Sequence, residues 1–377
     1  MNDGSTTDDR TSPDDVLHRD SHSRRERYRP VLRHVPTQGS AGFLTREDLR
    51  RAEPIHPAAA WPEELIRELQ ADEETVLGRA RSLKPFDDLP HSERTGFPGM
   101  RPDWLGQNYI ASAARSPISR AVLEAAAELG VVLPQRLLAY HPDEELFDRS
   151  YPWSTIGRVF VGTNADVTSK SFHNDWTSSG TGFMVGPRIM VTASHVAPWE
   201  PATWWMRFVP SYWGNLAGTA FTQPFGAAWV EEFVGVPHDG GSVTGEDVVV
   251  CKLTRRLGDA TGWLARWRWF DDDEYYNWPY TSVGYPGIPY GGERPVVQHF
   301  VAIEDVDDDG QGKELETMEF TSEGWSGGPL FFWRGTQPWA VGVASGRETD
   351  IFDPRRSVFS GGRRFTDLID QAERDWP

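Results

Sequence analysis

Apolar residues change their spacing after the first 150 residues. From Tyr151 onward they gather in short runs separated by Gly, Pro and Asp clusters, such as IGRVFVG, GFMVGPRIMVTA, EDVVVCKL, PVVQHFVAI and WAVGVASG. Short apolar runs bounded by turn residues are typical of β-strands. The last segment, FTDLIDQAERDW, returns to helical spacing. The pattern therefore predicts an all-β body over residues 151–377 that ends in a helix.

The first 150 residues divide into a polar tail and a region with helix signals. Residues 1–30 are rich in Asp, Ser, Thr and Arg and hold few apolar residues to bury, which predicts a disordered tail. Three helix starts follow, at Thr45 with its capping-box partner Asp48, at Pro62, and at Ser116-Pro117. The apolar spacing predicts that the second helix continues to Leu77. We therefore expect residues 31–150 to form a helical accessory or regulatory region.

The charge of the chain narrows the range of partners. Its 377 residues include 38 Lys and Arg against 56 Asp and Glu, a formal net charge of −18. Such a chain repels phosphate backbones and anionic lipid surfaces, which argues against nucleic-acid and membrane partners. No secretory signal is readable at the N-terminus, so we expect a cytoplasmic protein. The single cysteine, Cys251, lies in an apolar run and is expected to be buried and inert.

One short stretch, EGWSGGPLFF, suggests a nucleophile. Ser326 stands among glycines and is followed by Pro and large apolar residues. A serine hydroxyl becomes a nucleophile when an imidazole removes its proton and a carboxylate orients that imidazole. GWSGG also fits the nucleophile elbow of α/β-hydrolases, in which the histidine follows the serine in the chain. All ten histidines precede Ser326, so that order is impossible here.

The opposite order, His then Asp then Ser, has two well-placed candidates. His195 follows a predicted hairpin, GFMVGPRIMVTA, and such a rigid support suits a general base. Asp247 opens the strand-like run EDVVVCKL, where it is expected to lie partly buried beside the imidazole. Its neighbour Glu246 is expected to face solvent, because adjacent residues of a strand point to opposite sides. His238 and Asp239 are expected to be loop residues.

With GTGFMVG...VTASHV, GEDVVVCKL and GWSGGP in this order, the chain resembles the trypsin-like serine proteases of the chymotrypsin fold, and most closely their bacterial glutamyl-endopeptidase branch. The resemblance covers residues 151–377. It implies two six-stranded β-barrels with a cleft between them, His195 as general base, Asp247 as its orienting acid and Ser326 as nucleophile. It also implies an oxyanion hole formed by the backbone N–H groups of Gly324 and Ser326. The substrate would be a protein or peptide, and no cofactor would be required.

The resemblance also assigns a substrate pocket to Phe320, Thr321, Ala344, Ser345 and Gly346. Phe320 stands where trypsin has an Asp, so cleavage after Arg or Lys is not expected. Thr321 matches a hydroxyl of the glutamate-specific pocket, but Ala344 replaces the histidine of that branch, which argues against glutamate specificity. Trp325 replaces the Asp that receives the new N-terminal amine of trypsin, so that activation switch is not expected.

An acidic stretch, DVDDDGQGKELE, fits the calcium-loop pattern D-x-D-x-D-G-x5-E. In this pattern the ligands would be Asp305, Asp307, Asp309 and Glu316. Calcium loops are flanked by helices, however, and the segments on either side here are strand-like. A solvated hairpin tip is therefore the favoured interpretation, and Ca2+ binding remains the alternative.

Three functions are consistent with these motifs. The leading hypothesis is a serine endopeptidase that hydrolyses peptide bonds through a His-Asp-Ser triad and an acyl-enzyme intermediate. A second hypothesis is that residues 31–150 bind a regulatory partner and hold the protease silent. A third keeps the protease fold but makes it a regulated binding or effector module with little or no standing activity. The three intact triad residues argue against this third hypothesis.

Overall fold

The structure is a computed structural model that describes residues 42–84, 89, 95–111, 116–117, 138–139, 149–215, 217–318, 321–347 and 356–377. The tail predicted over residues 1–30 lies outside these ranges. So does the helix predicted from Ser116-Pro117, except for these two residues, which form the short strand β3 (Ser116–Pro117) rather than a helix start. Residues Ala41–Pro377 make up one compact unit.

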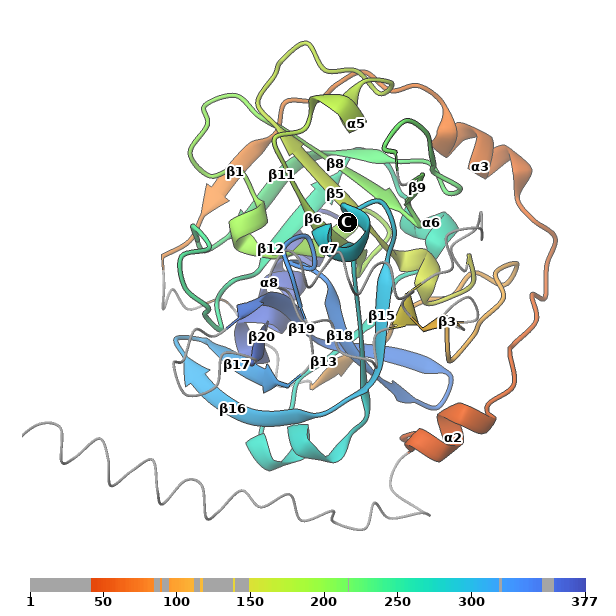
Figure 1. Cartoon of the computed structure of the whole chain (residues 1–377), viewed down its shortest axis with the longest axis vertical. Helices are drawn as coiled ribbons and strands as arrows, with labels where there is room; N and C mark the ends of the chain where they lie inside the picture. The colour runs from red at the N-terminus through yellow and green to blue at the C-terminus, as the bar shows by residue number, and fades with distance from the viewer. Residues whose placement is uncertain are drawn as a thin grey trace, which may run out of the picture. The chain divides into compact units, whose positions relative to one another are not determined.

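Six antiparallel strands in the first half of the body close into a β-barrel (Figure 1). Their order is β11-β12-β7-β6-β5-β8, and β8 pairs again with β11, which closes the ring. The predicted hairpin corresponds to β6 and β7, and EDVVVCKL leads into β12. The strands are β5 (Ile156–Gly162), β6 (Ser178–Met184), β7 (Ile189–Thr192), β8 (Trp205–Pro210), β11 (Ala228–Gly235) and β12 (Val249–Leu253).

The second half of the body forms another antiparallel ring, with the order β16-β17-β20-β19-β18-β14-β15. Strands β15 and β16 are consecutive and are interrupted only at Ala302, so the chain itself joins the two ends of the sheet. The ring thus has six strand positions, and the predicted double six-stranded β-barrel of the chymotrypsin type is confirmed. The strands are β14 (Tyr280–Gly284), β15 (Val296–Val301), β16 (Ile303–Asp309), β17 (Gly312–Thr317), β18 (Pro329–Arg334), β19 (Gln337–Arg347) and β20 (Ser357–Gly361).

Apolar side chains fill the interior of each ring. Val159, Phe183 and Val250 are fully buried among the strands of the first barrel, and Leu330 and Phe359 among those of the second. Burying one such side chain contributes about 1.5–3 kcal/mol. A register slip by one residue would turn these side chains outward, so the apolar pattern fixes the strand register on which the site depends.

The C-terminal helix α8 (Gly362–Asp375) confirms the predicted closing helix and contacts strands of both barrels. It packs near β7 and β12 of the first barrel and near β17, β19 and β20 of the second. Buried ion pairs fix it in place, with Arg266 contacting Asp370 and Arg268 Nη1 lying 2.9 Å from Asp367 Oδ1. The helix therefore joins the two halves of the body.

The described part of residues 31–150 runs along the barrels as an extended strap with two short helices (Figure 1). Helix α2 (Arg46–Arg51) has the predicted capping box at Thr45. Helix α3 (Glu63–Gln70) ends earlier than predicted, because Ala71 is extended and the chain turns toward strand β1 (Arg79–Ser82), which pairs in parallel with β11. Strand pairing with the body thus replaces part of the expected helical structure.

Short elements complete the described chain. They are β2 (Gly96–Phe97), β4 (Leu138–Ala139), η1 (Trp153–Thr155), α5 (Phe172–Asp175), η2 (Ser194–Val196), β9 (Trp213–Gly214), β10 (Phe221–Thr222), α6 (Gly258–Thr261), β13 (Ala265–Trp267), η3 (Asp272–Asn277) and α7 (Gly287–Tyr290). Among the helices of the described ranges, none has both the length and the apolar character needed to cross a bilayer.

Candidate active site

His195 lies in the turn η2, directly after strand β7. The preceding hairpin is closed by a hydrogen bond from Val185 N to Ile189 O at 2.9 Å. The hydroxyl of Ser194 donates to Val236 O, and the indole of Trp199 donates to Ser194 O at 2.9 Å. These contacts hold the backbone on both sides of His195, so the barrel wall supports the imidazole.

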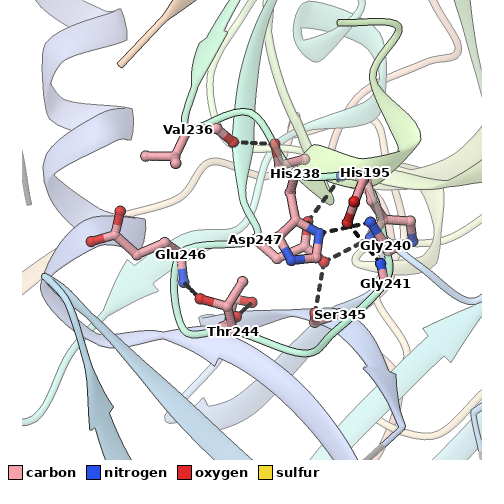
Figure 2. A network of polar contacts seen from close by, with 12 residues as sticks. His195, Val236, His238, Gly240, Gly241, Thr244, Glu246, Asp247 and Ser345 are labelled. Atoms are coloured by element: carbon pink, nitrogen blue, oxygen red, sulfur yellow. Dashed lines mark hydrogen bonds and ion pairs between the residues drawn. The ribbon is translucent and has the colours of Figure 1, made fainter. Parts of the chain in front are cut away.

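The Asp247 carboxylate accepts two hydrogen bonds from His195 (Figure 2). His195 Nδ1 lies 2.7 Å from Asp247 Oδ2, and the backbone N–H of His195 donates to Oδ1 at 3.0 Å. The hydroxyl of Ser345, on β19 of the other barrel, donates to Oδ2 at 2.6 Å. Asp247 is fully buried, whereas the His195 side chain is 20% exposed. The carboxylate is therefore an internal support for an imidazole that reaches solvent.

The pair shifts the pKa values of both groups. Burial lowers the pKa of His195, but the hydrogen bond and the charge of Asp247 outweigh burial and raise it above its ordinary value. Burial raises the pKa of Asp247, but the hydrogen bond and the charge of His195 and the hydroxyl of Ser345 hold it below its usual range. Each group therefore favours the charged form of the other.

Two neighbours of the pair come from the loop between β11 and β12. His238 and Asp239 lie in this loop as expected, and His238 Nδ1 is 4.0 Å from Asp247 Oδ1.

The expectation that Glu246 faces solvent is wrong. Glu246 is 5% exposed and forms an ion pair with Arg364 of α8 at 3.1 Å. The segment before β12 is not yet a strand, so strand alternation does not apply to it.

Ser326 lies in a tight loop that leads into β18, and its side chain is half-buried. Gly324 and Gly327 adopt positive φ angles of 86° and 89°, a region that favours glycine. Trp325 is fully buried, and its indole N–H donates to Ser282 Oγ at 2.9 Å. The tryptophan anchors the loop in the second barrel and leaves Ser326 at the loop surface.

The two peptide units of the expected oxyanion hole are held through their carbonyl groups. Gly287 N donates to Glu323 O at 2.7 Å, and Gly328 N donates to Trp325 O at 2.8 Å. In a trans peptide the N–H points opposite to the C=O, so these bonds orient the N–H groups of the next residues. Those residues are Gly324 and Ser326. Within the described ranges, neither N–H donates a hydrogen bond, so both are available to an anion.

The Ser326 loop packs against the segment that carries His195. Ser326 O accepts a hydrogen bond from Thr181 N at 2.8 Å, and the Thr181 hydroxyl donates to Gly324 O at 2.7 Å. A Cβ added to Gly327 would lie 3.0 Å from Ala193 N, two residues before His195. Among the described residues, no hydrogen bond joins Ser326 Oγ to His195 Nε2. Such bonds are often long without substrate and tighten in the bound complex.

The five residues of the expected substrate pocket differ in their positions and contacts. Phe320 lies outside the described ranges. The Thr321 hydroxyl is buried and lies 2.8 Å from Ser357 Oγ. Ala344 accepts from Gly327 N at 2.8 Å through its carbonyl group. Ser345 turns its hydroxyl to Asp247, and Gly346 follows it on β19. Ser345 thus supports the acid, a contact for which the sequence carries no local signal.

The acidic stretch forms a hairpin of β16 and β17 and not a calcium loop between helices. Carboxylate oxygens of Asp305, Asp307 and Glu316 lie within 4.8 Å of one another. Arg356 contacts Glu316 and lies 3.4 Å from Asp305 Oδ2. Asp309 accepts hydrogen bonds from Thr244 Oγ1 and Gly245 N instead. Three of the four expected ligands therefore lie close together, and Asp309 binds Thr244 and Gly245 instead.

No family model and no curated protein matches this sequence. The chain is similar to the protease Anisep from Arthrobacter nicotinovorans, with 16% identity over 59% of this chain and 96% of that one, and a TM-score of 0.43. It is also similar to a Glu endopeptidase in complex with MPD, with 16% identity over 60% and 93% and a TM-score of 0.43. A third similar structure is a thermostable serine protease AL20 from an extremophilic microorganism, with 18% identity over 59% of this chain and 98% of that one, and a TM-score of 0.43.

Proposed function

We propose that this chain, whose body has the chymotrypsin fold of trypsin-like serine proteases, is a serine endopeptidase. One observation carries the proposal above the others. A fully buried carboxylate, Asp247, binds Nδ1 of His195 at 2.7 Å, while the imidazole reaches solvent beside the loop that bears Ser326. A buried acid that orients a partly exposed imidazole is the arrangement a general base requires.

The proposed reaction has two halves. Ser326 Oγ attacks the carbonyl carbon of a peptide bond while His195 Nε2 takes the hydroxyl proton. The N–H groups of Gly324 and Ser326 stabilise the oxyanion, and the C–N bond then breaks as His195 returns the proton to the leaving amine. Water repeats the sequence on the acyl-enzyme, releases the acid and restores Ser326. Asp247 stabilises the imidazolium in both halves without itself becoming protonated.

Two alternatives from the sequence remain proposals with less support. A binding module without catalysis would gain nothing from a buried acid held by His195 and Ser345. A regulatory role for residues 31–150 is compatible with the strap, in which β1 pairs with β11. Deleting the whole region would also remove this strand, so a shorter deletion that keeps Arg79–Ser82 is the cleaner test of regulation.

A fluorophosphonate probe tests the proposed function directly. We expect the wild-type chain to react with the probe and to cleave a peptide library. Ser326→Ala should abolish labelling and lower kcat by about 10⁶-fold, since the nucleophile is lost. Ser322→Ala is the matched control, because Ser322 lies in the same loop with its hydroxyl 3.4 Å from Ile288 O. Labelling of Ser326→Ala at the wild-type rate would reject the proposal.

A further inference from the structure

The turn that precedes Asp247 is held by the second barrel. Asp247 N donates to Thr244 O at 3.3 Å, so residues Thr244, Gly245 and Glu246 form one tight turn with the acid. Any displacement of this turn moves the Asp247 backbone. The position of the carboxylate therefore depends on what holds residues 244–246.

The tip of the β16–β17 hairpin holds the first part of the turn. Asp309 Oδ2 accepts hydrogen bonds from Thr244 Oγ1 and, at 3.0 Å, from Gly245 N. The two backbones touch, because a Cβ added to Gly312 would lie 1.9 Å from Gly245 O. Ser360 Oγ of β20 donates to Thr244 O at 2.6 Å. The acidic motif thus acts on the first barrel through one of its carboxylates.

Helix α8 and the hairpin hold the last part of the turn. Glu246 Oε1 accepts from Gln311 N at 2.7 Å and from Arg364 Nη2 at 3.1 Å. Arg364 N in turn donates to Gln311 O at 2.8 Å, so the helix and the hairpin are fixed to each other. Glu246 and Arg364 are both buried, at 5% and 1% exposure. Separating the pair would leave an uncompensated buried charge, so its geometry is strongly held.

We propose that Asp309 and the Glu246–Arg364 ion pair are positioning residues that hold Asp247 against His195, so that the second barrel and its terminal helix set the geometry of an acid carried by the first. Ser345, Ser360 and the backbone of Gln311 add further hydrogen bonds from the second half of the body to the acid or its turn. This inference rests on the proposed function for its effect on catalysis, but not for its effect on the imidazole.

Asp309→Ala is the decisive variant. Loss of the acceptor should loosen the turn and weaken the bond from His195 to Asp247, which is the main contact that raises the pKa of the imidazole. Among the described titratable groups, His238 also faces this pair, with its Nδ1 4.0 Å from Asp247 Oδ1. We expect the pKa of His195 to fall and kcat to drop about 10- to 100-fold with KM unchanged, because a displacement of about 1 Å costs this much. Asp309→Asn keeps an acceptor oxygen and should restore most of both.

Two control variants separate positioning from stability. Asp308→Ala removes an 81% exposed carboxylate from the same strand, where it binds Lys313. Asp370→Asn removes the carboxylate that pairs with Arg266 from helix α8, the helix that also carries Arg364. Both should leave the pKa of His195 at its wild-type value. Asp370→Asn also shows what the loss of a buried ion pair does to the melting temperature alone.

The imidazole pKa is read by NMR in a Ser326→Ala background, so the measurement needs no peptidase activity. A fall in Asp309→Ala, restored in Asp309→Asn, supports the proposal even if the wild-type chain fails to react with fluorophosphonate. An unchanged imidazole pKa in a folded Asp309→Ala chain overturns it. An equal fall in Asp370→Asn overturns it as well, since the effect would then be general loosening of α8.

Discussion

His195 and Asp247 are held mainly by hydrogen bonds of side chains, whereas the loop around Ser326 is held mainly by hydrogen bonds to its backbone carbonyl groups, with the buried Trp325 as its side-chain anchor. On the first side, Asp247 receives His195 Nδ1, the His195 amide and the Ser345 hydroxyl. On the second side, Glu323 O and Trp325 O receive backbone N–H groups, and two glycines occupy positive φ. The difference follows from the task, since a base must titrate and an oxyanion needs fixed N–H donors.

This difference tells which substitutions each half tolerates. The His195–Asp247 pair depends on a few polar atoms, so replacing one such atom changes its chemistry while the backbone stays in place. The Ser326 loop depends on space and backbone conformation, so a single methyl group at a glycine is enough to disturb it. The two kinds of variant therefore separate the contribution of proton transfer from that of oxyanion stabilisation.

The largest effect is expected for Asp247→Asn. The amide cannot accept the Nδ1 proton through its NH2 group, so the imidazole is free to adopt the tautomer that cannot accept the serine proton. We expect kcat to fall about 10⁴-fold, with little change in KM. Ser345→Ala removes only one hydrogen bond to the same oxygen and should cost about tenfold. Steady-state kinetics on one peptide substrate would show equal losses for the two variants if Asp247 only fills space.

A smaller but still large effect is expected for Gly324→Ala. The added Cβ would lie 2.4 Å from Tyr285 O at a φ of 86°, so the peptide unit must move. Displacing one oxyanion donor costs about 10²- to 10³-fold in kcat. Gly218→Ala is the control, because Gly218 also has a positive φ of 66° but has no atom within 4 Å of the added Cβ.

Both glycine variants should lower the melting temperature, since a non-glycine residue at positive φ costs about 1–3 kcal/mol. Only Gly324→Ala should slow catalysis beyond what its stability explains. Equal rates for the two variants at a temperature where both are folded would show that the Gly324 amide plays no part in the reaction.

The sequence pointed to the residues with local signatures and missed those that depend on topology. His195 follows a recognisable hairpin, Ser326 stands in a glycine-rich turn, and the strand runs predicted the barrels. The burial of Glu246 could not be predicted in this way. Its partner Arg364 is 118 residues away and comes close only because α8 packs across both barrels.

The same reason explains the other differences. The helix expected to reach Leu77 ends at Gln70, and the chain beyond it runs without helical structure to β1, which pairs with a strand of the first barrel. The contact of Ser345 with Asp247 joins residues 98 apart. The acidic letters of the hairpin match a calcium loop, but β pairing decides where each carboxylate points. Letter patterns describe local chemistry, and long-range pairing decides which atoms meet.

The smallest effect sharpens the comparison through pH. Because the pKa of His195 is raised in the folded state, protonated His195 stabilises the fold fully below pH 6.5, the ordinary pKa of the group. This contribution is lost as the pH rises through the folded-state pKa. A lowered pKa of Asp247 stabilises the fold above 3.8, and this contribution is lost as the pH falls through the folded-state pKa. The difference in unfolding free energy between wild type and His195→Gln should therefore be largest between these values and smaller at pH 8. Denaturant titrations across this range, with His56→Gln as an exposed control, measure it, and a difference that grows above pH 7 would contradict the coupling.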